Sequence, residues 1–133
     1  MGIFGKLFGG DDASDQQKHT EKKMPWVALT TIEQLDEIAV SSNKKTQLIF
    51  KHSTRCGISR MVIKEFTASY NLSEEEATVF YLDLLNYREV SNAISEKFQV
   101  LHQSPQLLII KAGKVIAHDS HSAINEIILK DSI

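Results

Sequence analysis

Cysteine is scarce in this sequence: the 133 residues contain a single one, Cys56. One cysteine excludes a disulfide within the chain and a zinc site built from several thiolates. It is also typical of a reducing compartment, because small secreted domains usually carry several cysteines. We therefore expect a cytoplasmic protein that has no disulfide within the chain and no zinc site built from cysteines.

Long apolar segments and an excess of charge are missing as well. No run approaches the roughly 18–20 apolar residues of a membrane-spanning helix, and the N-terminus lacks the continuous apolar core of a signal peptide. The 15 basic and 17 acidic residues give a formal net charge of -2, which is not the electrostatic footprint of a nucleic-acid-binding protein. The hydrophobic fraction of 42% is that of an ordinary soluble domain.

A change in composition divides the chain near residue 24. Residues 11–23 contain no apolar side chain beyond Ala13, which predicts a disordered linker. In residues 1–10, four apolar side chains have the spacing of one face of a short helix that touches a membrane or a partner, but the glycines between them argue against a stable free helix. We expect a flexible tail and linker over residues 1–24 and one domain over residues 25–133, long enough to bury a core.

Apolar periodicity predicts strands and helices in alternation. Strands are expected at residues 27–29, 47–52, 78–82, 107–111 and 114–118, and helices at 31–39, from Cys56 to about 70, at 87–97 and from about 122 onward. Thr31 and Gln34 have the spacing of a capping box, and Ala112-Gly113 between two apolar runs is a hairpin signal. The order β-α-β-α-β-α-β-β-α predicts an α/β fold whose central mixed sheet has helices on both faces.

Cys56 lies where one of these strands ends and a helix begins. The apolar run over residues 47–50 precedes it. Apolar residues at the spacing of one helical face follow it: Ile58, Met61, Val62, Phe66 and Tyr70. Free backbone N–H groups and the positive end of the helix dipole favour an anion at such a position.

This placement favours the thiolate of Cys56, which is the nucleophilic form. We expect support from the charge of Arg55, from the backbone N–H groups of Gly57 and Ile58, and from the hydroxyl of Ser59. The alternative is that Cys56 is a small buried core residue, as many unpaired cysteines are.

A cysteine at the first turn of the second helix, with Ser104-Pro105 just before the hairpin, is the thioredoxin arrangement. Unlike a Cys-x-x-Cys pair, residues 56–59 hold one thiol, so a mixed disulfide on Cys56 must be resolved by a thiol from outside. Phe50 stands where dithiol thioredoxins carry a buried acid, which a chain without a resolving cysteine does not need.

Three segments resemble the monothiol bacilliredoxins, the redox proteins of the bacillithiol system: KHSTRCGIS (residues 51–59), SNAISEKF (91–98) and HQSPQ (102–106). The resemblance extends over roughly residues 26–128. It implies a thioredoxin-like fold and a protein that removes bacillithiol, a low-molecular-weight thiol, from the cysteines of client proteins.

The resemblance also implies roles for single residues. Cys56 would be the attacking thiol, and Ser59 would take the place of the resolving cysteine. Pro105 would be a cis proline facing Cys56, and Thr54, Ser104 and Pro105 would form the substrate-binding side.

The implied partners are S-thiolated client proteins and a small thiol such as bacillithiol as co-substrate, with no bound cofactor. The best-known members of the family carry proline where Gly57 stands. This departure should loosen the turn but keeps the nucleophile.

Other functions stay open at this point. A non-catalytic thioredoxin-fold adaptor would bind partners by its edge or tail, and a redox sensor would only buffer small thiols. A single-cysteine peroxidase is disfavoured, since Thr54 is too near Cys56 for the threonine that peroxide reduction needs and no upstream proline fits. The histidines, among them His118 and His121, are expected on the surface or in loops rather than in a metal site.

Overall fold

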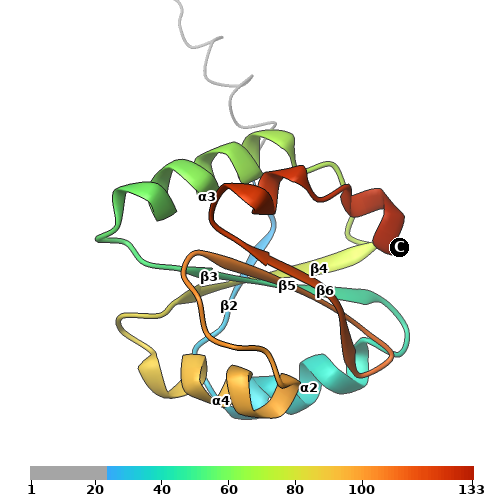
Figure 1. Cartoon of the computed structure of the whole chain (residues 1–133). Coiled ribbons are helices and arrows are strands. Elements are labelled where there is room, and N and C mark those ends of the chain that lie inside the picture. The colour runs from blue at the N-terminus through green and yellow to red at the C-terminus, as the bar shows by residue number, and fades with distance from the viewer. Residues whose placement is uncertain (1–23) are drawn as a thin grey trace, which may run out of the picture.

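The computed structural model describes residues 24–133. The segment expected to contact a membrane or partner (residues 1–10) and the expected linker (11–23) lie outside the described residues. A five-stranded sheet with the order β2-β4-β3-β5-β6 forms the centre (Figure 1). Its strands are β2 (Trp26–Ala28), β3 (Thr46–His52), β4 (Ala77–Asp83), β5 (Gln106–Lys111) and β6 (Lys114–Ser120).

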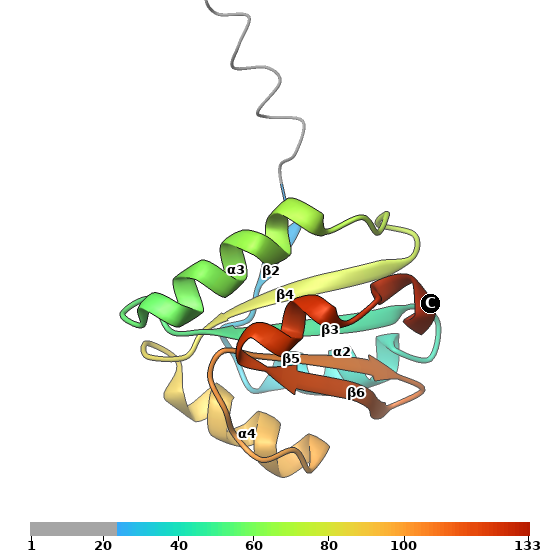
Figure 2. The same cartoon turned by 45° about the horizontal axis from the view of Figure 1, so that its top comes forward.

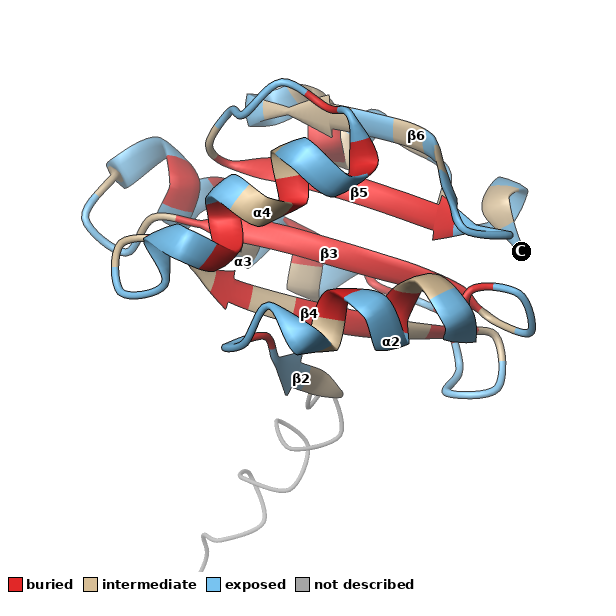
Figure 3. Cartoon of the chain, turned by 90° about the horizontal axis from the view of Figure 1, so that it is seen from below, coloured by how far each residue is buried: buried red, intermediate tan, exposed pale blue. Residues whose placement is uncertain are grey.

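Strand β3 is the middle of this sheet and carries the reactive turn at its carboxyl end. It pairs with β4 in parallel and with β5 antiparallel, and β2 pairs with β4 in parallel. All seven of its residues are buried, and Figure 3 shows β3 and β5 as almost wholly buried ribbons. The mixed α/β architecture predicted from the order of elements is confirmed.

Helices cover both faces of the sheet (Figure 1, Figure 2). The helices α2 (Glu33–Ser41) and α4 (Arg88–Phe98) lie on one face, and α3 (Gly57–Ser69) lies on the other. Successive side chains of β3 alternate between the two cores, because strand residues point to opposite faces. Ile49 packs with Leu35 and Ile94 on the α2–α4 face, whereas Phe50 packs with Phe66 on the α3 face.

Two local predictions about turns and caps are confirmed. The N–H of Thr31 donates to Gln34 Oε1 at 3.0 Å, and the N–H of Gln34 donates to Thr31 Oγ1 at 3.3 Å, which is the reciprocal capping box. In the β5–β6 hairpin, Ala112 and Gly113 have φ values of 55° and 79°. Positive φ at both central residues is the geometry of the two-residue hairpin turn.

The predicted last α-helix is wrong. The segment forms two short 3-10 helices, η1 (His121–Glu126) and η2 (Leu129–Ser132). Ile127, which lies between them, and Leu129, the first residue of η2, both pack on the α3-side core, while Ile128 is 64% exposed. This alternation is that of an extended chain, and it interrupts the helical spacing that the isoleucines suggest in the sequence. None of the helices in residues 24–133 has the length and apolar composition to cross a membrane.

Candidate active site around Cys56

The backbone places Cys56 immediately before α3, in an extended conformation (φ -100°, ψ 124°). Its N–H donates to the Ser53 carbonyl at 3.2 Å, and its carbonyl accepts the N–H of Arg60 at 3.0 Å. Cys56 is a free, half-buried cysteine, so the alternative that it is a buried core residue is wrong. The structure therefore places a reachable thiol at the N-terminus of a 13-residue helix.

Backbone N–H groups and arginine side chains lie next to Cys56 in the chain. Gly57 and Ile58 are the first two residues of α3, where backbone N–H groups have no partner within the helix. Among residues 24–133 no side chain caps this end of α3, and its first turn contains no acidic residue. Arg55 is exposed beside Cys56, and the Arg60 guanidinium donates to the Thr54 carbonyl at 3.2 Å, which ties the turn to the helix.

The hydroxyl of Ser59 bonds to His52 and Ser53 rather than to Cys56, the partner expected from the sequence. It is fully buried, and its Oγ lies 2.7 Å from His52 Nδ1 and accepts the N–H of Ser53 at 3.1 Å. The Ser59 hydroxyl and Nδ1 of His52 share one hydrogen bond, and the tautomer of the ring sets which of the two donates. The hydrogen bond expected from Ser59 to Cys56 is thus replaced, among the described residues, by a bond to His52.

His52 is the last residue of β3 and is suited to accept this bond. Burial lowers the pKa of its imidazole, which Asp83 raises and Arg60 lowers to smaller extents. A lowered pKa favours the neutral ring, which has an acceptor nitrogen.

The Ser104–Pro105 peptide bond is cis, and it lies at the same end of the sheet as Cys56. In the antiparallel pairing of β3 with β5, Lys51 stands opposite Gln106, the residue after Pro105. The Pro105 carbonyl accepts the N–H of His121 at 3.1 Å, and His121 has a φ of 58°. In Figure 1 the β3–α3, β4–α4 and α4–β5 connections all lie at this end.

A comparison of the whole chain with protein families agrees with this geometry. The model described as monothiol bacilliredoxin BrxC matches residues 27–129. The chain belongs to the monothiol bacilliredoxin family. The family predicted from the three sequence segments is confirmed, and with it a role in thiol redox chemistry.

Solved structures similar to this bacilliredoxin carry the thioredoxin fold. A candidate oxidoreductase with a thioredoxin fold is 27% identical, with a TM-score of 0.68 over 81% of this chain and 93% of that chain. Thioredoxin from Malassezia sympodialis is 14% identical (TM-score 0.62; 81% and 86% covered), and thioredoxin O2 from Arabidopsis thaliana is 17% identical (TM-score 0.61; 80% and 90% covered). At these identities the two thioredoxins show the fold alone, and the predicted thioredoxin-like fold is confirmed.

A basic pair in this bacilliredoxin, of a buried lysine and an exposed histidine, was missed from the sequence. Lys51 is fully buried in β3, and its Nζ lies 2.7 Å from His102 Nδ1. Burial lowers the pKa of Lys51 to about 8, and the pKa of His102 is lowered by burial and then by Lys51 and Arg88. As the ammonium donates to Nδ1, the ring proton of His102 is on Nε2. The sign of this pair in the sequence was Lys51 itself, a charged residue directly after the apolar residues of a predicted buried strand.

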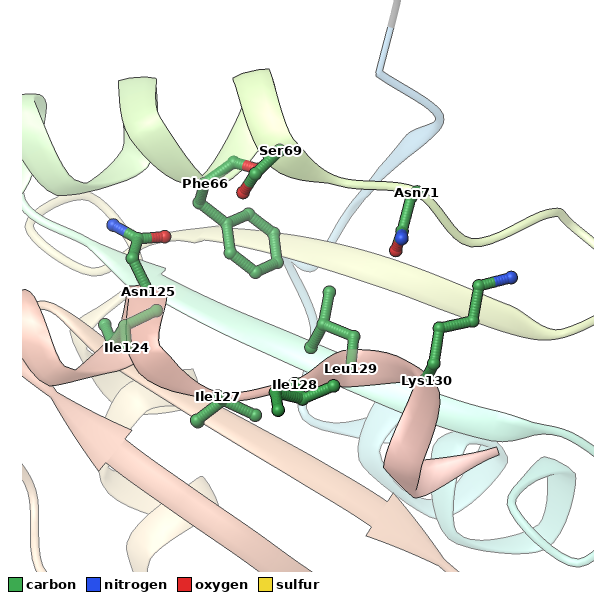
Figure 4. Close-up of a pocket in the computed structure, with 9 residues that line it drawn as sticks. All are labelled: Phe66, Ser69, Asn71, Ile124, Asn125, Ile127, Ile128, Leu129 and Lys130. Carbon is green, nitrogen blue, oxygen red and sulfur yellow. The ribbon is translucent and has the colours of Figure 1, made fainter.

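A pocket of this bacilliredoxin lies away from the thiol. It is formed between the end of α3 and the η1–η2 segment and is lined by Phe66, Ile124, Asn125 and Leu129, among others (Figure 4). None of its lining residues belongs to the Cys56 turn. Within residues 24–133, no three His, Cys, Asp or Glu side chains converge as metal ligands would.

Proposed function

We propose that this bacilliredoxin is a monothiol thiol-disulfide oxidoreductase that removes a bacillithiol-type small thiol from mixed disulfides on client proteins through Cys56. The observation that carries the proposal is one free, half-buried cysteine ahead of α3, at the same end of the sheet as Ser104-Pro105. No second thiol exists in the chain. The reducing cytoplasm is the compartment that suits such a thiol.

In the first step, the Cys56 thiolate attacks the sulfur of the small thiol. The bond between that sulfur and the client sulfur breaks, the client leaves as a thiolate that takes up a proton from water, and the small thiol stays on Cys56 as a mixed disulfide. Arg55 and the N–H groups of Gly57 and Ile58 stabilise the thiolate before attack. Thr54, Ser104 and Pro105 form the surface on which the client segment is bound.

The second step needs a thiol from outside, because Ser59 cannot form a disulfide. A second small thiol, as its thiolate, attacks the mixed disulfide and leaves as a symmetrical small-molecule disulfide, which returns Cys56 to its thiolate. A low-molecular-weight thiol is therefore a co-substrate, and no bound cofactor is required.

The test mixes the full chain with a client protein capped by bacillithiol and follows masses over time. We expect the cap on Cys56 and a freed client thiol, and no transfer to C56S. Since Cys56 is half-buried and makes no side-chain cap bond, C56S should change the free energy of unfolding by less than about 0.5 kcal/mol. Absence of transfer to the folded wild type would overturn the proposal and leave the adaptor function.

A variation of the same assay separates a catalyst from a thiol buffer. With excess small thiol, a catalyst uncaps many client molecules per chain. A buffering sensor stops after one client per chain, with the cap retained on Cys56.

A further inference from the structure

The pocket between the end of α3 and the η1–η2 segment is lined largely by apolar side chains. Those that belong to the α3-side core or pack on it are Phe66, Ile124, Ile127 and Leu129 (Figure 4). Ile128 also lines the pocket and is 64% exposed, although isoleucine is among the residues most often buried. The pocket volume of about 190 Å³ suits one or two side chains rather than a drug-sized ligand, which needs a larger cleft.

Hydrogen bonds and an ion pair hold the walls of this pocket in place. Asn125 in η1 donates from Nδ2 to the Val62 carbonyl at 3.2 Å and to Glu65 Oε1 at 3.3 Å, which fixes η1 against α3. Lys130 in η2 lies 3.2 Å from the Glu76 carboxylate. Because both 3-10 helices are tied down, the pocket is formed before anything enters it, and an occupant need not order its walls.

The N-terminal segment of the chain carries apolar side chains that fit such a pocket. Residues 1–10 contain two large aliphatic and two aromatic side chains, whereas residues 11–23 contain neither kind; the four are Ile3, Phe4, Leu7 and Phe8. Their spacing is that of one helical face. Apolar side chains gathered in one segment gain free energy by leaving water.

The described part of the chain begins near this pocket. Met24 packs on the α3-side core, as Leu129 does, and the ring of Trp26 stacks on that of Phe66 with centroids 6.1 Å apart. A coil of the length of residues 11–23 has an r.m.s. end-to-end distance of roughly 20 Å. This distance exceeds the diameter of a helix with its side chains, about 10–12 Å. Residues 3–8 can therefore reach the pocket around the end of α3.

We propose that the apolar side chains of residues 3–8 dock in this pocket of their own chain. The aromatic rings of Phe4 and Phe8 contact Phe66 and Leu129, and the docked segment covers the exposed side of Ile128. This removes apolar surface of the segment and of the pocket from water at once. The pocket contains no residue of the Cys56 turn, so docking leaves the thiol accessible.

The tether decides that the occupant is the same chain rather than a second copy. A contact of one or two apolar side chains has a dissociation constant of about 1 mM. A short linker gives an effective concentration of about the same size, so the intramolecular contact is formed in a large share of the molecules. A second copy at micromolar concentration would occupy the pocket only rarely.

The test places a nitroxide at position 5 and measures the loss of methyl NMR signals. The label is attached to G5C in the C56S chain, which has no other cysteine. A tethered label causes some loss without docking, so the readout is the change when the apolar contacts are removed. Adding F4S/F8S should raise the intensities of the Ile127 and Leu129 methyls roughly twofold, as expected for a contact that is about half formed.

Matched controls separate docking from a general change of the tail or fold. Q16S/Q17S alters two polar residues of the same N-terminal region and should leave the intensities unchanged. I128N makes the pocket polar at a side chain that is 64% exposed and should raise the intensities as F4S/F8S does. V40N changes a 68% exposed valine on α2, at the opposite face of the sheet, and should have no effect.

Equal intensities with and without F4S/F8S would overturn the inference. Signal loss that appears only when a spin-labelled chain is mixed with an isotope-labelled chain without nitroxide would assign the pocket to a second copy and overturn it as well. Vesicles of phosphatidylcholine and phosphatidylglycerol provide the third arm. If they sedimented the wild-type chain but not F4S/F8S, while the methyl intensities of the two were equal, the segment would be a lipid contact and the inference would be wrong.

Discussion

Ser59 Oγ lies 2.7 Å from Nδ1 of His52, and this bond joins the end of β3 to the first turn of α3. The same oxygen accepts the N–H of Ser53. Both side chains are buried, with exposed fractions of 0% for Ser59 and 5% for His52. The loop that carries Cys56 is thus held to α3 by two hydrogen bonds to one buried hydroxyl.

Replacing Ser59 by alanine should destabilise the protein. The change leaves the His52 nitrogen and the Ser53 N–H without their partner in a buried place, which costs about 1–3 kcal/mol. Urea unfolding of S59A measures the loss. The control on the same helix is S69A, whose exposed hydroxyl bonds only to carbonyls of its own helix and whose effect should stay within about 0.5 kcal/mol. Equal stability of the two variants would contradict the role assigned to Ser59.

Replacing Ser59 by cysteine should convert the monothiol site into a dithiol site. The new thiol lies at the position of a resolving cysteine, so it should expel the small thiol from Cys56 and form an internal disulfide. Mass spectrometry should show a transient cap on S59C and a lasting cap on wild type when no free thiol is added. A lasting cap on folded S59C would show that residue 59 does not reach Cys56.

The free energy of unfolding should rise with pH because of Lys51. Burial lowers its pKa from the ordinary 10.5 to about 8, so between these values the unfolded chain binds more protons than the folded one, and stability increases with pH. The free energy of unfolding of K51M minus that of wild type should therefore be about 2 kcal/mol larger at pH 7 than at pH 9.5.

Urea unfolding at the two pH values measures this difference. Burial raises the pKa of Tyr70 to about 12, but that group is present in both proteins and cancels. K111M, which replaces an exposed lysine, should follow the wild-type curve. Parallel curves for K51M and wild type would contradict a buried, charged Lys51.

Gly57 should be replaceable with a gain in stability. It is the first residue of α3, and a Cβ there would meet nothing nearer than Arg60 Nη2 at 3.8 Å, an ordinary contact. G57A should raise the free energy of unfolding by about 0.4–1 kcal/mol, because the unfolded chain loses freedom. G57P should fit as well, since Cys56 is already extended and proline suits the first helical position.

The matched control is G113A, at a glycine whose φ of 79° disfavours a side chain. It should lower the free energy of unfolding by about 1 kcal/mol. If G57A destabilised the protein as G113A should, the glycine at position 57 would have a role that the structure does not show.

The sequence alone determined the alternation of strands and helices, the capping box at Thr31, the hairpin at Gly113 and the place of Cys56 at a strand–helix junction. Each of these depends on residues near one another in the chain, through periodicity, turn chemistry or helix termini. It could not show that Ser59 bonds to His52 or that Lys51 pairs with His102, 51 residues away.

Only the tertiary structure decided such partners, because a side chain in a strand or loop has several partners within reach whose hydrogen bonds differ in net free energy by only about 1 kcal/mol. Tertiary packing also decided the conformation of the last segment of the chain. Its isoleucines allowed a helix, but packing Ile127 and Leu129 on the same core favoured an extended link between two 3-10 turns.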